Sequence, residues 1–76
     1  MFLSELSIKD VVNNEDGIKL GKIVDIEVDV ATGKVLSIII DRGFRFASIF
    51  STKNQTTISW DKVVKIGNDV IIVEQN

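Results

Sequence analysis

The stretch that decides the fold is residues 20–40, LGKIVDIEVDVATGKVLSIII. From Val24 to Val30, aliphatic residues alternate with acids, which is typical of a β-strand with one buried face and one solvated face. The second half of the stretch ends in three consecutive isoleucines, so both faces of that strand require cover. The stretch therefore predicts a β-hairpin with two unequal strands, joined by a turn over 30–33.

The flanking sequence predicts further short strands. They are expected over 8–13, 19–30, 34–41, 56–60 and 70–73, and a segment that begins at Gly43 carries alternating phenylalanines. A brief helical turn is expected over 4–7, whereas 59–66 suits either a helical turn or a continuing strand. Five or six short strands separated by closely spaced turns indicate an all-β domain, either a small barrel or a sandwich.

The chain contains no proline, so its turns depend on Gly, Asn and Asp. Gly21 interrupts a strand pattern, which predicts a β-bulge or a sharp bend at that position. The residues assigned to structural turns are Asp16, Gly17, Gly21, Thr32, Gly33, Gly67 and Asp69.

Seventy-six residues predict a single domain over 1–76 with a small core. Domains of this size usually need a disulfide, a structural metal or a second chain to be stable. Cysteine and histidine are both absent, which excludes disulfides and zinc sites built from those residues. Association is the remaining supplement, and we therefore expect a homodimer.

The charge balance disfavours direct nucleic-acid binding. Nine basic residues against 11 acidic ones give a net charge of −2, whereas nucleic-acid affinity rests mostly on neutralising phosphates. No apolar run approaches the roughly 18 residues that span a bilayer. The first residues meet an acid at Glu5 and include no basic stretch, so no signal peptide is expected. These features predict a cytoplasmic protein without a transmembrane segment.

Few residues suggest chemistry. Asp25, Glu27 and Asp29 follow the spacing of the first three ligands of a calcium-binding EF-hand loop, but Val30 and Leu36 occupy its required glycine and glutamate positions. We interpret the three carboxylates as a solvated face, with a divalent-metal site as the alternative. Histidine, cysteine and tyrosine are absent, the serines have no histidine to activate them, and no glycine-rich loop opens a helix. We therefore expect no enzymatic activity, no catalytic residue, no cofactor and no metal.

The segment 42–55 is the strongest candidate for an interaction surface. It carries three basic residues and no acid, together with four large apolar residues within seven positions. Arginine beside aromatic residues is enriched in protein interfaces. The alternatives are a fourth strand that contributes these residues to the core, and contact with an anionic membrane, for which the basic signal is weak. The candidate surface comprises Phe44, Arg45, Phe46, Ile49 and Phe50.

Several of these motifs, in this order, resemble the PRC-barrel family. They are DGIKLGKIVD at 16–25, TGKV at 32–35 and IGNDVIIV at 66–73. The opening LSEL at 3–6 and ISWDKV at 58–63 resemble its stand-alone, sporulation-associated YlmC/YmxH subgroup, although Ser59 stands where members usually carry proline.

The resemblance implies an all-β PRC-barrel of five to six short, mostly antiparallel strands with at most one short helical turn. It also implies a non-catalytic protein-interaction or adaptor module linked to sporulation, with an unidentified protein partner. The alternative is an accessory domain in ribosome assembly or RNA processing.

Overall fold

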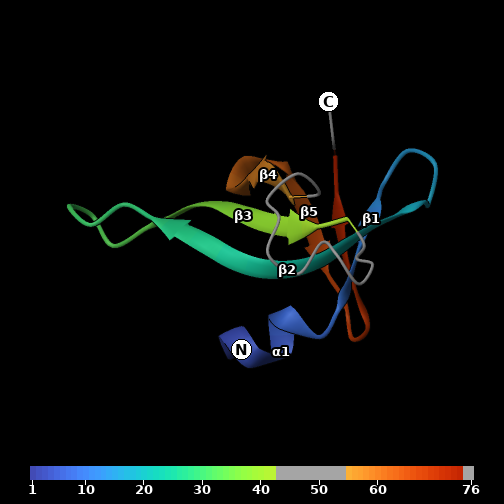
Figure 1. Ribbon diagram of the computed structural model, residues 1–76, viewed down its shortest axis with the longest axis horizontal. Coiled ribbons are helices and arrows are strands. Elements are labelled where there is room, and N and C mark those ends of the chain that lie inside the picture. Colours follow the sequence, from blue (N-terminus) through green and yellow to red (C-terminus); the bar gives the residue numbers. More distant parts are fainter. Residues whose placement is uncertain (43–54, 75–76) are drawn as a thin grey trace.

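The computed structural model describes residues 1–42 and 55–74, which form one mixed six-stranded sheet with short helical elements (Figure 1). The elements in chain order are α1 (Leu3–Ser7), β1 (Asp10–Asn13), β2 (Lys19–Val28), β3 (Val35–Asp41), β4 (Gln55–Ser59), the 3₁₀ turn η2 (Trp60–Lys62), β5 (Val63–Ile66) and β6 (Val70–Val73). The predicted all-β fold is therefore confirmed. The sequence predicted at most one short helical turn, and the structure adds η2 to α1.

The strands lie in the order β4-β3-β2-β1-β6-β5. Every neighbouring pair is antiparallel except β1 and β6, which run parallel from Asp10 beside Val70 to Asn13 beside Val73. The expectation of mostly antiparallel pairing is thus confirmed. For 59–66 the two alternatives both contribute, because a 3₁₀ turn comes first and a strand follows it.

The core is small and centres on β3. Its buried apolar side chains are Val11, Leu20, Ile23, Ile38, Ile40, Ile58, Ile71 and Val73. Both Ile38 and Ile40 are 0% exposed, whereas Ile39 between them is half-buried on the opposite face. The strand with the three isoleucines is therefore covered on both faces, but the face that carries Ile39 is covered incompletely.

The predicted burial pattern of the first hairpin strand is wrong for its three valines, whereas Ile26 packs against the core as expected. Val24, Val28 and Val30 are 50%, 42% and 97% exposed, although the alternation placed them on a buried face. Ile23 pairs with Ile40 and Asp25 with Ile39, so Val24 is an extra residue that forms a β-bulge. The hairpin then continues as a projecting ribbon beyond the reach of β4 (Figure 1), where the core cannot cover its apolar side chains.

Gly21 lies where β2 passes very close to the end of β3. Its φ is +140°, and a Cβ at this position would lie 1.9 Å from the carbonyl oxygen of Asp41. The β1–β2 register also shifts here, since Val11 pairs with Gly21 and Val12 with Lys19. The predicted bulge is therefore present, and only glycine fits its backbone.

Candidate functional site

The N-terminal segment places four large apolar side chains in solvent. Met1, Phe2, Leu3 and Ile8 are 72%, 75%, 53% and 73% exposed, and we call them the N-terminal apolar patch. Leu6 faces the other way and packs against the core. Because a five-residue helix has a single inward position here, the remaining apolar residues have no place in the core.

Polar contacts hold this segment in place. The Glu5 carboxylate accepts a hydrogen bond from the Phe2 N–H at 2.9 Å, which caps the first turn of α1. Lys9 is only 7% exposed, and its Nζ donates to the backbone oxygen of Asn68 at 2.5 Å. Lys22 Nζ donates to the carbonyl oxygen of Ile8 at 2.9 Å. The patch is therefore displayed on a fixed support that is tied to β2 and to the β5–β6 turn.

An ion-pair cluster lies beside this support. The Asp10 carboxylate is 3.1 Å from Lys22 Nζ and 3.5 Å from Lys19 Nζ. The hydrogen bond from Lys22 lowers the pKa of Asp10 below its ordinary value and outweighs the opposing effect of desolvation, with the charge of Lys19 acting in the same direction as Lys22. All three side chains are partly or largely exposed, as is usual for ion pairs at a protein surface. We interpret the cluster as a structural contact between β1 and β2 and not as a reactive site.

Sequence reasoning missed this cluster, although a signal for it was present. The Asp16-Gly17 turn fixes the β1–β2 hairpin, and counting outward from it, with one extra residue for the bulge predicted at Gly21, brings Asp10 opposite Lys22. An acid and a base directly opposite each other in a hairpin predict a cross-strand ion pair.

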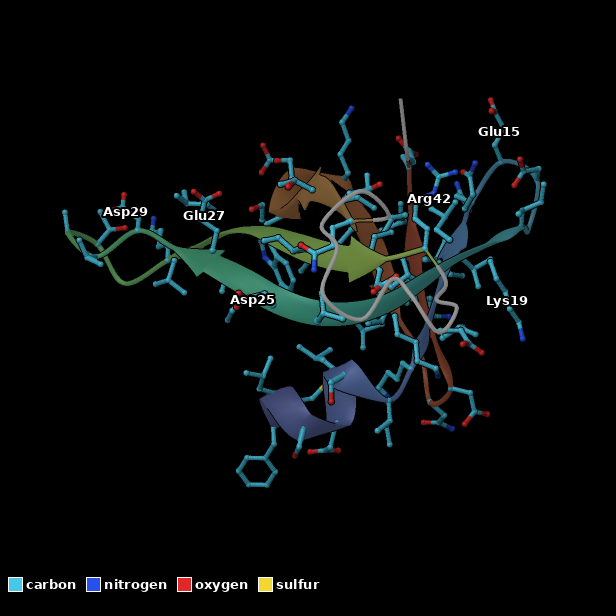
Figure 2. All side chains as sticks on the ribbon, in the orientation of Figure 1. Glu15, Lys19, Asp25, Glu27, Asp29 and Arg42 are labelled. Carbon is cyan, nitrogen blue, oxygen red and sulfur yellow. The ribbon has the colours of Figure 1, made fainter. Side chains whose placement is uncertain are left out.

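The three hairpin carboxylates each have a local hydrogen-bond donor. Asp25 Oδ1 accepts the N–H of the next residue at 2.8 Å, Glu27 Oε1 accepts the hydroxyl of buried Ser37 at 2.9 Å, and Asp29 Oδ1 accepts the Ala31 N–H at 2.9 Å. Figure 2 shows the three acids spread along the projecting hairpin. Among residues 1–42 and 55–74, no group of three metal-ligating side chains comes together. In this geometry each of the three carboxylates has its own local donor.

The residues assigned to turns lie at structural positions. In the β1–β2 turn, Asp16 Oδ1 accepts the N–H two residues later at 2.9 Å, and Gly17 follows it. In the β2–β3 turn, Thr32 Oγ1 accepts the N–H two residues later at 3.3 Å, beside Gly33 with a φ of +76°.

The last turn joins β5 to β6 and contacts β1. The Gly67 N–H donates to the Val70 carbonyl at 2.7 Å, and the Asp69 carbonyl accepts the Asp10 N–H at 3.1 Å. Gly67 therefore helps to close the β5–β6 turn, and Asp69 connects that turn to β1.

The candidate interaction surface at Phe44, Arg45, Phe46, Ile49 and Phe50 lies outside the described residues. Sequence reasoning did not identify the N-terminal apolar patch. Its signal is the presence of Met1, Phe2, Leu3 and Ile8 around a helix that is too short to bury more than one of its faces. In the part of the chain that the structure describes, no helix has the length and apolarity needed to cross a membrane.

Comparisons with known proteins agree with this fold. The chain is 44% identical over 71 residues to the probable sporulation protein YlmC of Bacillus subtilis (strain 168), an alignment that covers 93% of this chain and 88% of the relative. It is 37% identical over 71 residues to an uncharacterized protein of Clostridium acetobutylicum, covering 93% of this chain and 80% of that protein. The family model described as PRC-barrel domain matches residues 1–76. The chain therefore belongs to the PRC-barrel family and is a homologue of a probable sporulation protein.

Proposed function

We propose that this protein is a non-catalytic protein-binding module that acts as a homodimer, with the N-terminal apolar patch as the contact between copies. The observation that carries the proposal is the exposure of Met1, Phe2, Leu3 and Ile8 on a support that polar contacts hold in place. Four large apolar side chains exposed within eight residues are an unusual concentration, and exposed apolar surface that is not scattered singly marks interaction sites.

Burial of the patch favours association. Fully burying a large apolar side chain gains roughly 1.5–3 kcal/mol relative to full exposure, and side chains that are 53–75% exposed gain correspondingly less. Association costs about 4–15 kcal/mol in lost freedom, so the proposed contact requires that most of these side chains on both copies are covered together. The small core supports the same proposal, because residues 1–42 and 55–74 contain eight buried apolar side chains and a domain of this size usually needs a supplement.

A binding role also fits the composition. General acid–base and nucleophilic catalysis most often use histidine or an activated cysteine, and the chain contains neither. Similarity to the probable sporulation protein YlmC supports a role in sporulation.

Cross-linking tests the proposed contact directly, because the chain has no native cysteine. In separate variants, Leu3→Cys and Ile8→Cys place a thiol within the patch, and Ile18→Cys places one at a 58% exposed position in the β1–β2 turn. A short bis-maleimide should cross-link the two patch variants into dimers much faster than the Ile18 variant. Equal rates at all three positions would contradict the proposed contact.

The segment 44–50 is a second proposed surface, for a partner other than a second copy. Its phenylalanines beside Arg45 have the composition of interface residues. Replacement of Phe46 and Phe50 by serine should abolish partner capture from sporulating cells while the far-ultraviolet circular dichroism spectrum is unchanged. An unfolded variant would instead assign these residues to the core.

A further inference from the structure

The outer edge of β2 at residues 23–28 has backbone groups available for pairing. β1 pairs with β2 only between Lys19 and Lys22, whereas β3 follows the other edge of β2 as far as Val28. Within residues 1–42 and 55–74, no strand continues along the outer edge beyond Lys22. We call residues 23–28 the open edge of β2.

The backbone at Ile26 faces this open edge. Antiparallel strands alternate between positions that bond to the partner strand and positions that face away from it. The Ile26 N–H donates to Asp25 Oδ1 at 2.8 Å. We therefore place Ile26 among the positions that face away from β3. The Ile26 N–H therefore points toward an incoming strand. A backbone carbonyl of that strand replaces the Asp25 carboxylate as the acceptor of this N–H.

The side chains along the open edge combine apolar and acidic character. Val24 and Val28 are 50% and 42% exposed, and the acids Asp25 and Glu27 are also exposed. Figure 2 shows Asp25 and Glu27 at separate positions along the β2–β3 hairpin. The helix α1 lies beside β2, but it leaves these four side chains in solvent, and the hairpin extends past it (Figure 1).

Charge selects the strand that fits this edge. If a second copy paired with the edge around a two-fold axis at Ile26, Asp25 of one copy would face Glu27 of the other, and like charges directly opposite each other are destabilising. A strand that carries lysine or arginine at those positions meets opposite charges instead. Its intervening aliphatic residues cover Val24 and Val28.

We propose that the open edge of β2 binds an extended segment of a partner protein in which basic residues alternate with aliphatic ones, and that this segment adds a strand to the sheet. The proposal rests on the proposed function as a protein-binding module and assigns it a partner chemistry. It uses a surface distinct from the N-terminal apolar patch.

A synthetic peptide tests the pairing. The probe is the acetylated and amidated peptide Ac-TKVKVKT-NH₂, and its control is Ac-TEVEVET-NH₂. Titrated into ¹⁵N-labelled protein, the basic peptide should shift the amide resonances of Ile26 and Val28 and slow their hydrogen exchange, with an affinity that falls as salt rises. The acidic peptide should leave these resonances unchanged.

Variants separate charge recognition from a change in structure. Asp25→Asn with Glu27→Gln removes two charges and keeps an oxygen to accept the Ile26 N–H and the Ser37 hydroxyl. This variant should bind the basic peptide roughly two- to thirty-fold more weakly. The control, Glu15→Gln with Glu74→Gln, removes two charges at exposed positions elsewhere and should bind within about two-fold of the native protein.

Several outcomes would overturn the proposal. They are resonance shifts confined to β4 or β5, equal affinity for the two peptides, equal loss in the two variants, or self-association of the protein through the open edge. The double variant Phe2→Ser/Leu3→Ser, which changes only the N-terminal apolar patch, separates this proposal from the proposed function. A variant of monomer mass that binds the basic peptide as the native protein does shows that the open edge acts independently of the patch. A variant that stays dimeric contradicts the contact through the patch, and its binding of the basic peptide still tests the open edge.

Discussion

Gly21 shows how one residue fixes the path of two strands. A Cβ at this position would overlap the Asp41 carbonyl at 1.9 Å, and the φ of +140° is itself unfavourable for any other residue. We expect Gly21→Ala to lower the free energy of unfolding by at least about 2 kcal/mol, because backbone strain and overlap act together.

Gly33 provides the matched control. It also has a positive φ, of +76°, but a Cβ there meets no atom within 4 Å. Gly33→Ala should therefore cost only about 1–2 kcal/mol, from the left-handed backbone alone. Urea unfolding of the two variants measures the difference, and equal losses would contradict the close approach of β2 to Asp41.

Asp10 gives the fold a defined dependence on pH. Its pKa is lowered in the folded state, first by the hydrogen bond from Lys22 and then by the charge of Lys19. A lowered pKa stabilises the fold when the pH is above the ordinary value of 3.8, and this contribution is lost as the pH falls through the lower folded value.

Asp10→Asn should therefore be less stable than the native protein at pH 6, and the difference should shrink below pH 3 and in high salt. Urea unfolding at both pH values measures this effect, with Asp61→Asn, which removes an exposed acid outside the cluster, as the comparison. A difference of the same size at both pH values would show that the carboxylate acts through packing instead of charge.

At the scale of elements, β3 shows how the two faces of a strand differ in energy. Ile38 is 0% exposed, whereas Ile39 lies half-buried between Asp25 of β2 and Thr57 of β4. Ile38→Ala should cost about 2–5 kcal/mol, and Ile39→Ala about 1–2 kcal/mol, because a half-covered site loses less transfer energy and leaves a smaller cavity. Thermal and urea unfolding compare the two variants. An equal or larger cost at Ile39 would mean that its face is covered by more than the described strands.

The hairpin also shows which parts of the fold follow from sequence patterns. Turn residues and β-branched runs predicted its two strands to within two residues of the observed ends, because these signals are local. The exposure of Val24, Val28 and Val30 was not predictable from such local signals. It depends on a bulge at Val24 and on how far β4 extends along β3, and both are set by pairings between distant segments.

At the scale of the molecule, the parallel pairing of β1 with β6 joins the two ends of the chain in one sheet. The family and its fold were predictable because the turn and strand motifs occur in the expected order along the chain. The N-terminal apolar patch was not predicted. The short helix indicated that some of its apolar neighbours must be exposed, but the sequence pattern does not say which of them pack inward. Only the position of α1 against β2 distinguishes Leu6 from Leu3 and Ile8.

The oligomeric mass of the protein tests the central claim most directly. Light scattering at micromolar concentration should give about twice the monomer mass of 8.4 kDa for the native chain. The double variant Phe2→Ser/Leu3→Ser should give the monomer mass with the same circular dichroism spectrum, since both side chains are exposed in the single chain. A native protein that is monomeric at this concentration, or a double variant that remains dimeric, would contradict the proposed contact between copies.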